Sequence, residues 1–155
     1  MGKVAVVLGS SSDQKTMEDC FEYLDGFGIE HELKILSAHR TPEDVREFAT
    51  GAKDEGYDLV IAGAGLAAHL PGVIAAYTPL PVIGVPIDAG SMDGLDALYS
   101  MVQMPGGVPV ATVAIGKHGA RNSAVLAAQI LALSDEEIAQ RVSKFKQNGC
   151  RFKSS

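Results

Sequence analysis

The apolar residues of this chain form short continuous runs, separated by longer stretches in which they recur every three or four positions. A continuous run of roughly four to eight apolar residues predicts a buried strand, whereas the longer spacing predicts an amphipathic helix. Strands and helices that alternate in this way predict a three-layer α/β domain around a parallel sheet. The five predicted strands cover residues 4–8, 32–36, 58–62, 81–86 and 110–115.

The predicted helices follow the strands, and residues at their ends mark several of the boundaries. Gly28 suits the end of the first helix, and Thr41 with Pro42 suits the N-cap and first turn of the second. Ser134 and Glu137 form a capping box for an extra helix at the C-terminal end. The predicted helices cover residues 13–28, 42–56, 73–76, 94–102, 123–133 and 134–149.

The middle of the chain contains two glycine-rich segments, 63–72 and 116–122, which we expect to form loops after the third and fifth strands. Between them, the helix that begins at Gly94 carries apolar residues at helical spacing. This spacing predicts that Leu95, Leu98 and Val102 face the core.

The predicted helix over 123–133 is apolar almost all round, with Gln129 as its main polar residue. A helix on the outside of a small domain normally turns one side to water. The pattern therefore predicts that another subunit covers part of this helix. The residues from about 150 to 155 are expected to form a frayed tail.

Length and charge limit the classes of function. The 155 residues fit a single domain, over residues 1–155, and the net charge of −6 argues against binding nucleic acid through bulk electrostatics. Cys20 and Cys150 lie far apart, so neither a disulfide framework nor a metal site is expected. No apolar run reaches the length of a membrane span, and Met1 to Lys3 leads directly into a strand rather than a signal peptide. We expect a cytoplasmic protein without a membrane partner.

The segment from Ser37 to Pro42 contains the most reactive combination of side chains. His39 titrates near neutral pH and Arg40 is a permanent cation, and both follow a strand and precede a helix. In an open α/β sheet this turn lies at the rim where ligands bind, so the pair suits acid-base chemistry on an anionic substrate. On these residues alone, a solvated Arg40 and a structural His39 remain the alternative.

Two other turns share this predicted position. Ser10, Ser12 and Asp13 open a helix after the first strand and suit either phosphate binding or helix capping. The segment 63–72 after the third strand contains His69 among small residues, which leave room for a ligand near the backbone. In a sheet of flavodoxin-like order, all three turns meet at one rim, which makes an active site there the favoured interpretation.

Four segments of the chain form an ordered set of motifs. They are Gly9-Ser10-x-Ser12-Asp13, Ser37-Ala38-His39-Arg40-Thr41-Pro42, Ala62-Gly63-Ala64-Gly65-x-Ala67-Ala68-His69-Leu70-Pro71-Gly72 and Gln103-Met104-Pro105-Gly106-Gly107-Val108-Pro109. In these segments the chain resembles a known family, the N5-carboxyaminoimidazole ribonucleotide mutases of purine biosynthesis, which belong to the class I phosphoribosylaminoimidazole carboxylases. The resemblance covers about residues 4 to 138 and implies a cofactor-free enzyme of flavodoxin-like fold that assembles as a homo-octamer. The reaction that it implies moves a carboxylate from the exocyclic nitrogen to carbon 4 of an aminoimidazole ribonucleotide.

The resemblance assigns roles to individual residues. His39 would be the general acid-base, and Arg40 would hold the phosphate of the ribonucleotide. Ser10, Ser12 and Asp13 would bind the ribose phosphate region. The residues that would line the pocket for the imidazole and the carboxylate are Ser37, Ala38, Ala64, Gly65, His69 and Leu70.

Two features depart from the family pattern. Leu66 stands where a glycine is expected, and the loop from Asp88 to Asp93 is more acidic than the family's loop. The resemblance therefore does not define the exact shape of the pocket. A related group of carboxylases, which uses free CO2, carries lysine after the histidine. Arg40 therefore favours the mutase over that carboxylase.

Three other classes of protein share the flavodoxin-like fold and are alternatives to the mutase. A flavin-binding electron carrier needs aromatic residues near the rim, where Tyr77 and Tyr99 are the candidates. A signalling receiver domain needs an aspartate at the end of the third strand, and Ala62 and Gly63 stand there instead. A module that binds nucleotides without catalysis would share the site residues, and only turnover separates it from an enzyme.

Overall fold

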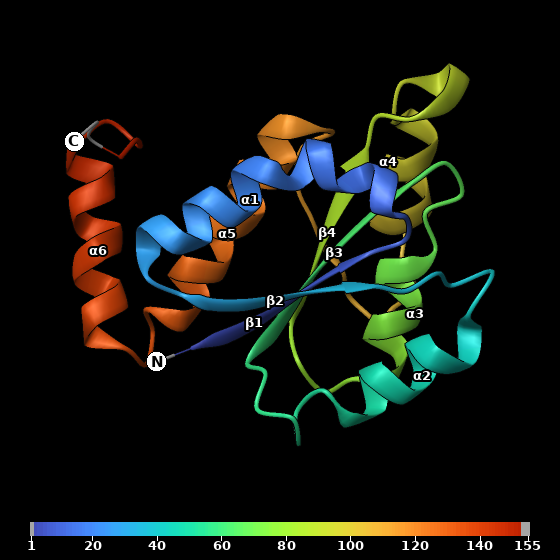
Figure 1. Ribbon diagram of the computed structural model, residues 1–155, viewed down its shortest axis with the longest axis horizontal. Helices are drawn as coiled ribbons and strands as arrows, with labels where there is room; N and C mark the ends of the chain where they lie inside the picture. The colour runs from blue at the N-terminus through green and yellow to red at the C-terminus, as the bar shows by residue number, and fades with distance from the viewer. Residues whose placement is uncertain (1, 153–155) are drawn as a thin grey trace.

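The computed structural model describes residues 2–152 and contains a five-stranded parallel sheet in the order β2-β1-β3-β4-β5. This is the predicted flavodoxin-like order (Figure 1). β1 and β3 are central, whereas β2 and β5 are the edges, each with one neighbour. The strands are β1 (Lys3–Leu8), β2 (Glu30–Ile35), β3 (Leu59–Gly65), β4 (Val82–Ile87) and β5 (Ala111–Thr112).

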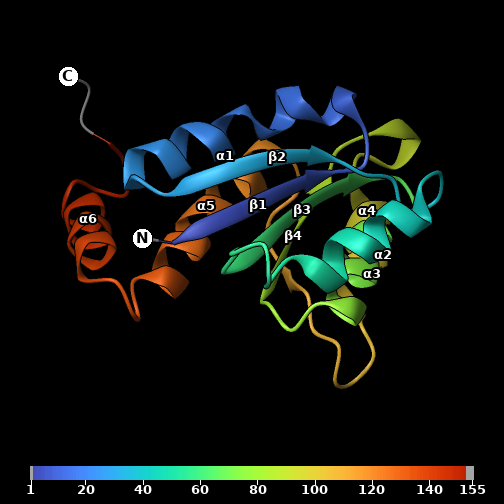
Figure 2. The ribbon, with the colours of Figure 1, turned by 60° about the horizontal axis from the view of Figure 1, so that its bottom comes forward.

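Helices cover both faces of the sheet, as Figure 2 shows most clearly. α1, α5 and α6 belong to one core with the side chains of Val4, Val6 and Leu8, and α2, α3 and α4 to the other with those of Ala5 and Val7. The continuous apolar run of β1 therefore supplies both cores. The helices are α1 (Gln14–Phe27), α2 (Pro42–Gly51), α3 (Leu70–Tyr77), α4 (Leu95–Val102), α5 (Lys117–Leu131) and α6 (Glu136–Gln147).

The edge strand β2 is the least buried of the longer strands, because its residues alternate between exposed and half-buried positions. Glu32 lies at the centre of a polar cluster on it: the Tyr57 hydroxyl donates to its carboxylate, and Lys34 Nζ lies 3.2 Å from Glu32 Oε1. The hydrogen bond from Tyr57 lowers the pKa of Glu32 to about 2. Charged side chains also discourage an edge strand from pairing with other chains.

The strand predicted to end at Ala62 continues to Gly65, so Gly63 to Gly65 belong to β3 and not to a loop. A Cβ on Gly63 would lie only 2.9 Å from Leu8 Cδ2, so the missing side chain makes room for packing across the sheet. The loop between β3 and α3 is therefore shorter than predicted and begins at Leu66.

The prediction of a loop over 116–122 is also wrong, because all of this segment after Gly116 is helical. Here too a glycine serves packing and does not mark a loop. A Cβ on Gly119 would lie 1.7 Å from the carbonyl oxygen of Ala114, so this glycine permits a close approach of the backbone. Arg121 in this first part of α5 forms an ion pair with the buried Asp19 of α1. β5, in turn, is much shorter than predicted.

The orientation predicted for α4 is wrong. Ala97 and Met101 face the core, whereas Leu95 is 41% exposed and Val102 is 45% exposed. Tyr99, one turn from Leu95, is 59% exposed. α4 therefore has apolar residues on both faces, and its spacing could not show which face would be buried.

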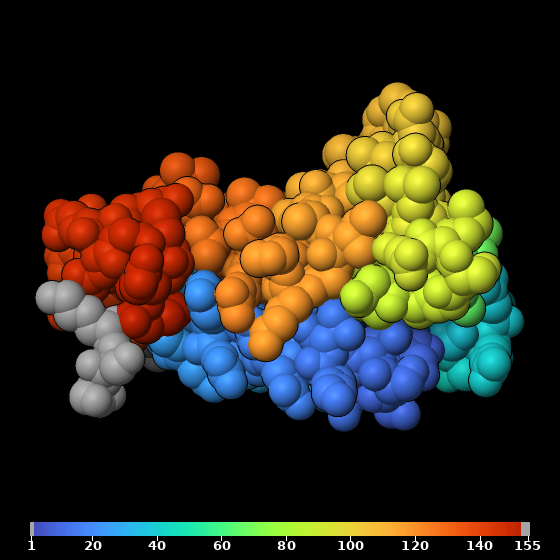
Figure 3. Space-filling view, turned by 90° about the horizontal axis from the view of Figure 1, so that it is seen from above, coloured from blue at the N-terminus to red at the C-terminus, as the bar shows by residue number. Residues whose placement is uncertain are grey.

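Within the chain, α5 packs against α1 and α6, which lie below it and to its left in Figure 3. Ala124, Ala127 and Ala128 are fully buried there. Leu133, just beyond the helix, is 88% exposed. The chain itself thus covers the alanine side of this helix, whereas Val125, Leu126 and Ile130 are only half-buried.

The C-terminal helix begins at Glu136, because Asp135 rather than the predicted Ser134 is its N-cap and accepts a hydrogen bond from the backbone N–H of Ile138. The predicted frayed tail is partly wrong. The ring of Phe152 packs against Phe27 and Phe145 with centroids 5.0 Å apart in each case. Residues 153–155 lie outside the part of the chain that the structure describes.

Within residues 2–152, no helix has both the length and the apolar composition to cross a membrane.

Candidate active site

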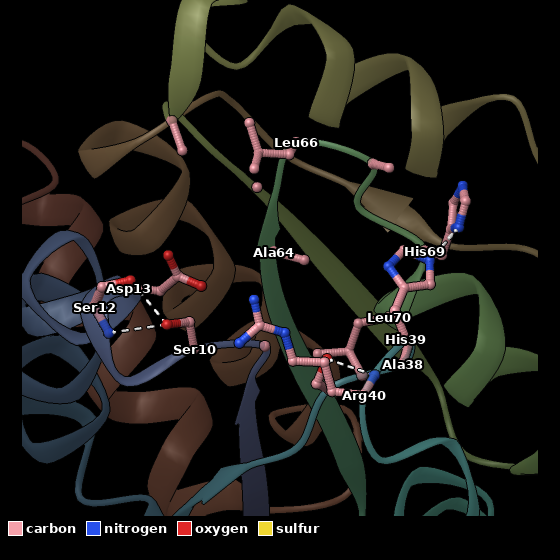
Figure 4. A pocket seen from close by; sticks show the side chains of 15 residues that line it. Ser10, Ser12, Asp13, Ala38, His39, Arg40, Ala64, Leu66, His69 and Leu70 are labelled. Carbon is pink, nitrogen blue, oxygen red and sulfur yellow. Dashed lines mark hydrogen bonds between the residues drawn. The ribbon is translucent and has the colours of Figure 1, made fainter.

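The turns after β1, β2, β3 and β4 enclose a cavity of about 290 Å³ at the carboxyl edge of the sheet (Figure 4). It lies across β1 and β3, where the strand order reverses, which is the usual ligand position in this kind of sheet. All eleven residues predicted for the site line this cavity. The lining consists of Gly9, Ser10, Ser12, Asp13, Ser37, Ala38, His39, Arg40, Ala64, Gly65, Leu66, Ala67, His69, Leu70 and Ala89.

The turn that carries His39 and Arg40 is closed by hydrogen bonds between Ser37 and the residues that follow it. The backbone N–H of Arg40 donates to Ser37 Oγ at 3.1 Å, and Thr41 Oγ1 donates to the Ser37 carbonyl at 3.2 Å. Thr41 Oγ1 also accepts a bond from the Ser37 N–H at 3.1 Å, so its side chain closes the turn and does not cap α2. These three hydrogen bonds define the shape of the turn without a ligand.

His39 and His69 come from different turns and meet through their rings. Nε2 of His39 lies 2.7 Å from Nδ1 of His69, and the rings are nearly perpendicular, at 86°. A hydrogen bond at this distance requires one nitrogen to carry a proton and the other to offer a lone pair. The pair can thus hold a proton and pass it from one ring to the other.

Arg40 points away from the histidine pair, toward Ser10 and Asp13 (Figure 4). The turn after β1 is a short helical turn, Ser11–Asp13, in which Ser10 Oγ accepts a bond from the Ser12 N–H at 3.3 Å. Ser10 is therefore the cap at this position, and not Ser12 or Asp13. Burial raises the pKa of Asp13, although a backbone hydrogen bond at Ser10 opposes this. One end of the cavity thus combines a guanidinium with hydroxyls at the start of a helix.

The two departures from the family pattern reach the cavity to different extents. Leu66 lines it and has a φ of 56°, in the left-handed region where glycine is favoured. Asp88 and Asp93 are exposed and do not line it, so the acidic loop contributes only Ala89.

Gly9, Ala67 and Ala89 also line the cavity and were not among the predicted site residues. Ala89 follows β4, so the rule that ligands bind at the carboxyl ends of the strands could have identified it. The aromatic residues Tyr77 and Tyr99 do not line the cavity, which argues against a flavin stacked there. Among residues 2–152, no group of three or more His, Cys, Asp or Glu side chains is placed to hold a metal ion.

The fold and this cavity define a flavodoxin-like α/β protein whose site has a hydrogen-bonded histidine pair at one end and an arginine beside serine hydroxyls at the other. The family model for AIR carboxylase matches residues 3–151. The chain is 54% identical to N5-carboxyaminoimidazole ribonucleotide mutase of Vibrio vulnificus over 93% of its length and 89% of the relative. It is 52% identical to the enzyme of the same name from Saccharolobus solfataricus, with 96% and 92% of the two chains covered.

A crystal structure of Treponema denticola PurE superposes with a TM-score of 0.84 and 34% identity, covering 96% of this chain and 92% of that one. A 3-dehydroquinate dehydratase-like protein from Bifidobacterium longum, at 19% identity and a TM-score of 0.55, shares only the fold. The chain belongs to the AIR carboxylase family.

Proposed function

We propose that this protein is an N5-carboxyaminoimidazole ribonucleotide mutase of purine biosynthesis. The observation that carries the proposal is that His39 and Arg40, adjacent in the sequence, serve opposite ends of one cavity. Relatives with about half their residues identical bear this name over most of the chain. A ribonucleotide requires an anion site for its phosphate, and carboxyl transfer to a ring carbon requires a group that removes a proton.

The proposed roles follow from the positions of the side chains. Arg40, with Ser10 and Ser12, holds the phosphate, and Asp13 accepts hydrogen bonds from the ribose. Ala38, Ala64, Gly65 and Leu70 shape the space for the ring, and His69 orients His39 through their hydrogen bond. Ser37 acts mainly by closing the turn that carries His39.

In the proposed reaction, the bond between the exocyclic nitrogen and its carboxylate carbon breaks, and CO2 is released within the site. The electron pair stays on nitrogen, which takes a proton from protonated His39. Carbon 4 of the ring then attacks CO2, and His39 removes the proton from carbon 4. The net result is an isomerisation that consumes no other reactant.

Incubation of the purified protein with N5-carboxyaminoimidazole ribonucleotide, without ATP, tests this function. Formation of 4-carboxy-5-aminoimidazole ribonucleotide faster than in an enzyme-free blank is the expected result. A protein that makes this product only from the uncarboxylated ribonucleotide and CO2 would be the related carboxylase. Binding of the ribonucleotide without turnover would indicate a non-catalytic module.

We also propose that residues 1–155 act as one catalytic domain in the cytoplasm. The four turns that form the cavity are spread from β1 to β4, so the site needs most of the sheet. Cys20 and Cys150 are both free thiols, as a reducing compartment allows.

A homo-octamer is the proposed assembly, and the outer face of α4 supports a subunit contact. Leu95, Tyr99 and Val102 are exposed at spacings of four and three, which places three large apolar side chains on one side of the helix. The segment after α4 projects from the body of the molecule (Figure 3).

Replacing Tyr99 with glutamate should therefore dissociate the assembly while leaving the subunit folded. Tyr99 is 59% exposed in the single chain, so the change costs little within one subunit but places an unpaired charge in the contact. Light scattering should show eight chain masses for the wild type and a smaller species for the variant. Leu133→Glu, at another exposed position, is the matched control, and an unchanged mass for Tyr99→Glu would argue against α4 as the contact.

A further inference from the structure

Leu66 has a backbone conformation that does not suit its side chain. Its φ of 56° is adopted freely by glycine but is unfavourable for leucine. The side chain is 53% exposed in the single chain, so burial in the core does not hold the residue in this conformation. Contacts of its side chain with the segment after β4 account for the position instead.

The contacts form an interlock between the ends of β3 and β4. A Cβ on Gly90 would lie 2.5 Å from Leu66 Cδ2, so the leucine occupies the space above a glycine. A Cβ on Gly65 would lie 3.0 Å from the Cβ of Ala89, so the alanine occupies the space above the other glycine. Each side chain thus lies over the glycine of the other segment, so Leu66 has a packing partner although it is exposed.

This interlock lies at the edge of the cavity. Leu66 lines the cavity above Ala64, while Arg40 lies on the opposite side (Figure 4). Ala67 and Ala89 supply small side chains beside it. The other leucine of the lining, Leu70, is only 2% exposed, so Leu66 is the large apolar side chain at the open side of the site.

We propose that Leu66 retains the CO2 that is released in the site. This inference depends on the mutase function proposed above. CO2 is small and uncharged, so hydrogen bonds and ion pairs hold it poorly, and contact with apolar side chains must keep it beside the ring. Leu66 is in position to block the route between the ring and bulk water, and the interlock keeps it there.

Escape of CO2 has a defined chemical result. After the bond between nitrogen and carboxylate breaks, the pair on nitrogen takes a proton whether or not CO2 stays. If CO2 remains, carbon 4 captures it and the product carries the original carboxyl carbon. If CO2 leaves, it exchanges with dissolved CO2 and bicarbonate, and any product formed later carries a carbon from solution.

The test uses a substrate with ¹³C in its carboxylate, in buffer with excess unlabelled bicarbonate. The measured quantity is the fraction of ¹³C in the carboxylate of the product, by mass spectrometry. Wild-type enzyme should retain nearly all of the label, and Leu66→Ala and Leu66→Gly should each lose at least about tenfold more of it. Because the substrate also loses its carboxylate spontaneously, label retention is measured at early times and compared with the ¹³C fraction that remains in the unreacted substrate.

The two variants separate the side chain from the backbone. Both variants remove the apolar side chain that covers the site. Leu66→Ala keeps a Cβ, which is unfavourable at positive φ, whereas Leu66→Gly also removes this unfavourable backbone conformation. Loss of label in both supports the proposal, and loss in the glycine variant alone would assign the effect to backbone freedom and overturn it. Leu133→Ala, outside the cavity, should match the wild type.

The remaining outcomes are also decisive. If the wild type converts substrate and both variants retain the label, Leu66 has no role in holding CO2, while the mutase function stands. A wild type that loses its label during turnover would overturn the retention of CO2 altogether. A wild type that makes no product would reject the proposed function itself, and this inference with it.

Discussion

Replacing His39 with asparagine should lower the turnover number by about 100-fold or more, the usual effect of removing a positioned acid-base group. Asparagine is close to histidine in size and cannot exchange a proton near neutral pH. The turn that carries residue 39 is held by Ser37 and Thr41, and these bonds do not involve the His39 side chain. The fold and most of the ribonucleotide affinity should therefore remain. Single-turnover kinetics, which separate chemistry from binding, measure the effect.

Comparison with other histidines makes this result specific. His118→Asn changes an exposed histidine of α5 that does not line the cavity. The turnover number of this variant should equal that of the wild type. His69→Asn should have an intermediate effect, because it removes the partner of His39 Nε2 and leaves His39 itself in place. Turnover close to that of the wild type in His39→Asn would mean that another group carries the proton.

Replacing Arg40 with alanine should raise the Michaelis constant for the ribonucleotide by about 10- to 100-fold, as expected when a hydrogen bond to a charged group is lost. The backbone N–H of residue 40 still donates to Ser37 Oγ in this variant, so the turn should keep its shape. Because the side chain of Arg40 is exposed, thermal stability should hardly change. Initial rates over a range of substrate concentrations, with melting curves of the free proteins, give both quantities.

Two further variants show whether this effect belongs to the phosphate site. Arg40→Lys keeps the positive charge but loses the planar guanidinium, which can donate two hydrogen bonds to one phosphate. Its affinity for the ribonucleotide should therefore lie between those of Arg40→Ala and the wild type. Arg46→Ala removes an exposed arginine of α2 that pairs with Glu43 outside the cavity, and it should leave the Michaelis constant unchanged. If the Michaelis constant rises equally in Arg40→Ala and Arg46→Ala, general electrostatic attraction of the substrate would explain the effect, and a phosphate site at Arg40 would not.

The sequence predicted the order of the elements well, because buried parallel strands such as β1 and β4 are continuous apolar runs. It failed where glycine serves packing instead of a turn. Gly63 and Gly119 were interpreted as loop residues, but the space that they leave is filled by Leu8 and by the Ala114 carbonyl. Such contacts join residues far apart in the chain or bring two backbones together, and local pattern contains no information about them.

In the site, too, the sequence predicted the general position of residues but not the contacts between them. The rule that turns after parallel strands meet at one rim was sufficient to bring His39, Arg40 and the Ser10 turn together. It could not predict that His39 would bond to His69 while Arg40 pointed the other way, because this depends on the closed shape of the turn after β2. It also could not show that a leucine at residue 66 would keep the backbone shape of a glycine.

The position of β2 at the edge of the sheet has a consequence for how activity is lost. His39 and Arg40 directly follow this strand, which bonds to β1 alone and exposes part of its length. Edge elements open by local unfolding at lower free energy than the core, which here lies around β1 and β3. Mild denaturant should therefore abolish turnover before the global transition, and amide hydrogens of β2 should exchange earlier than those of β1. The residues proposed to perform the chemistry thus depend on the part of the sheet that separates first.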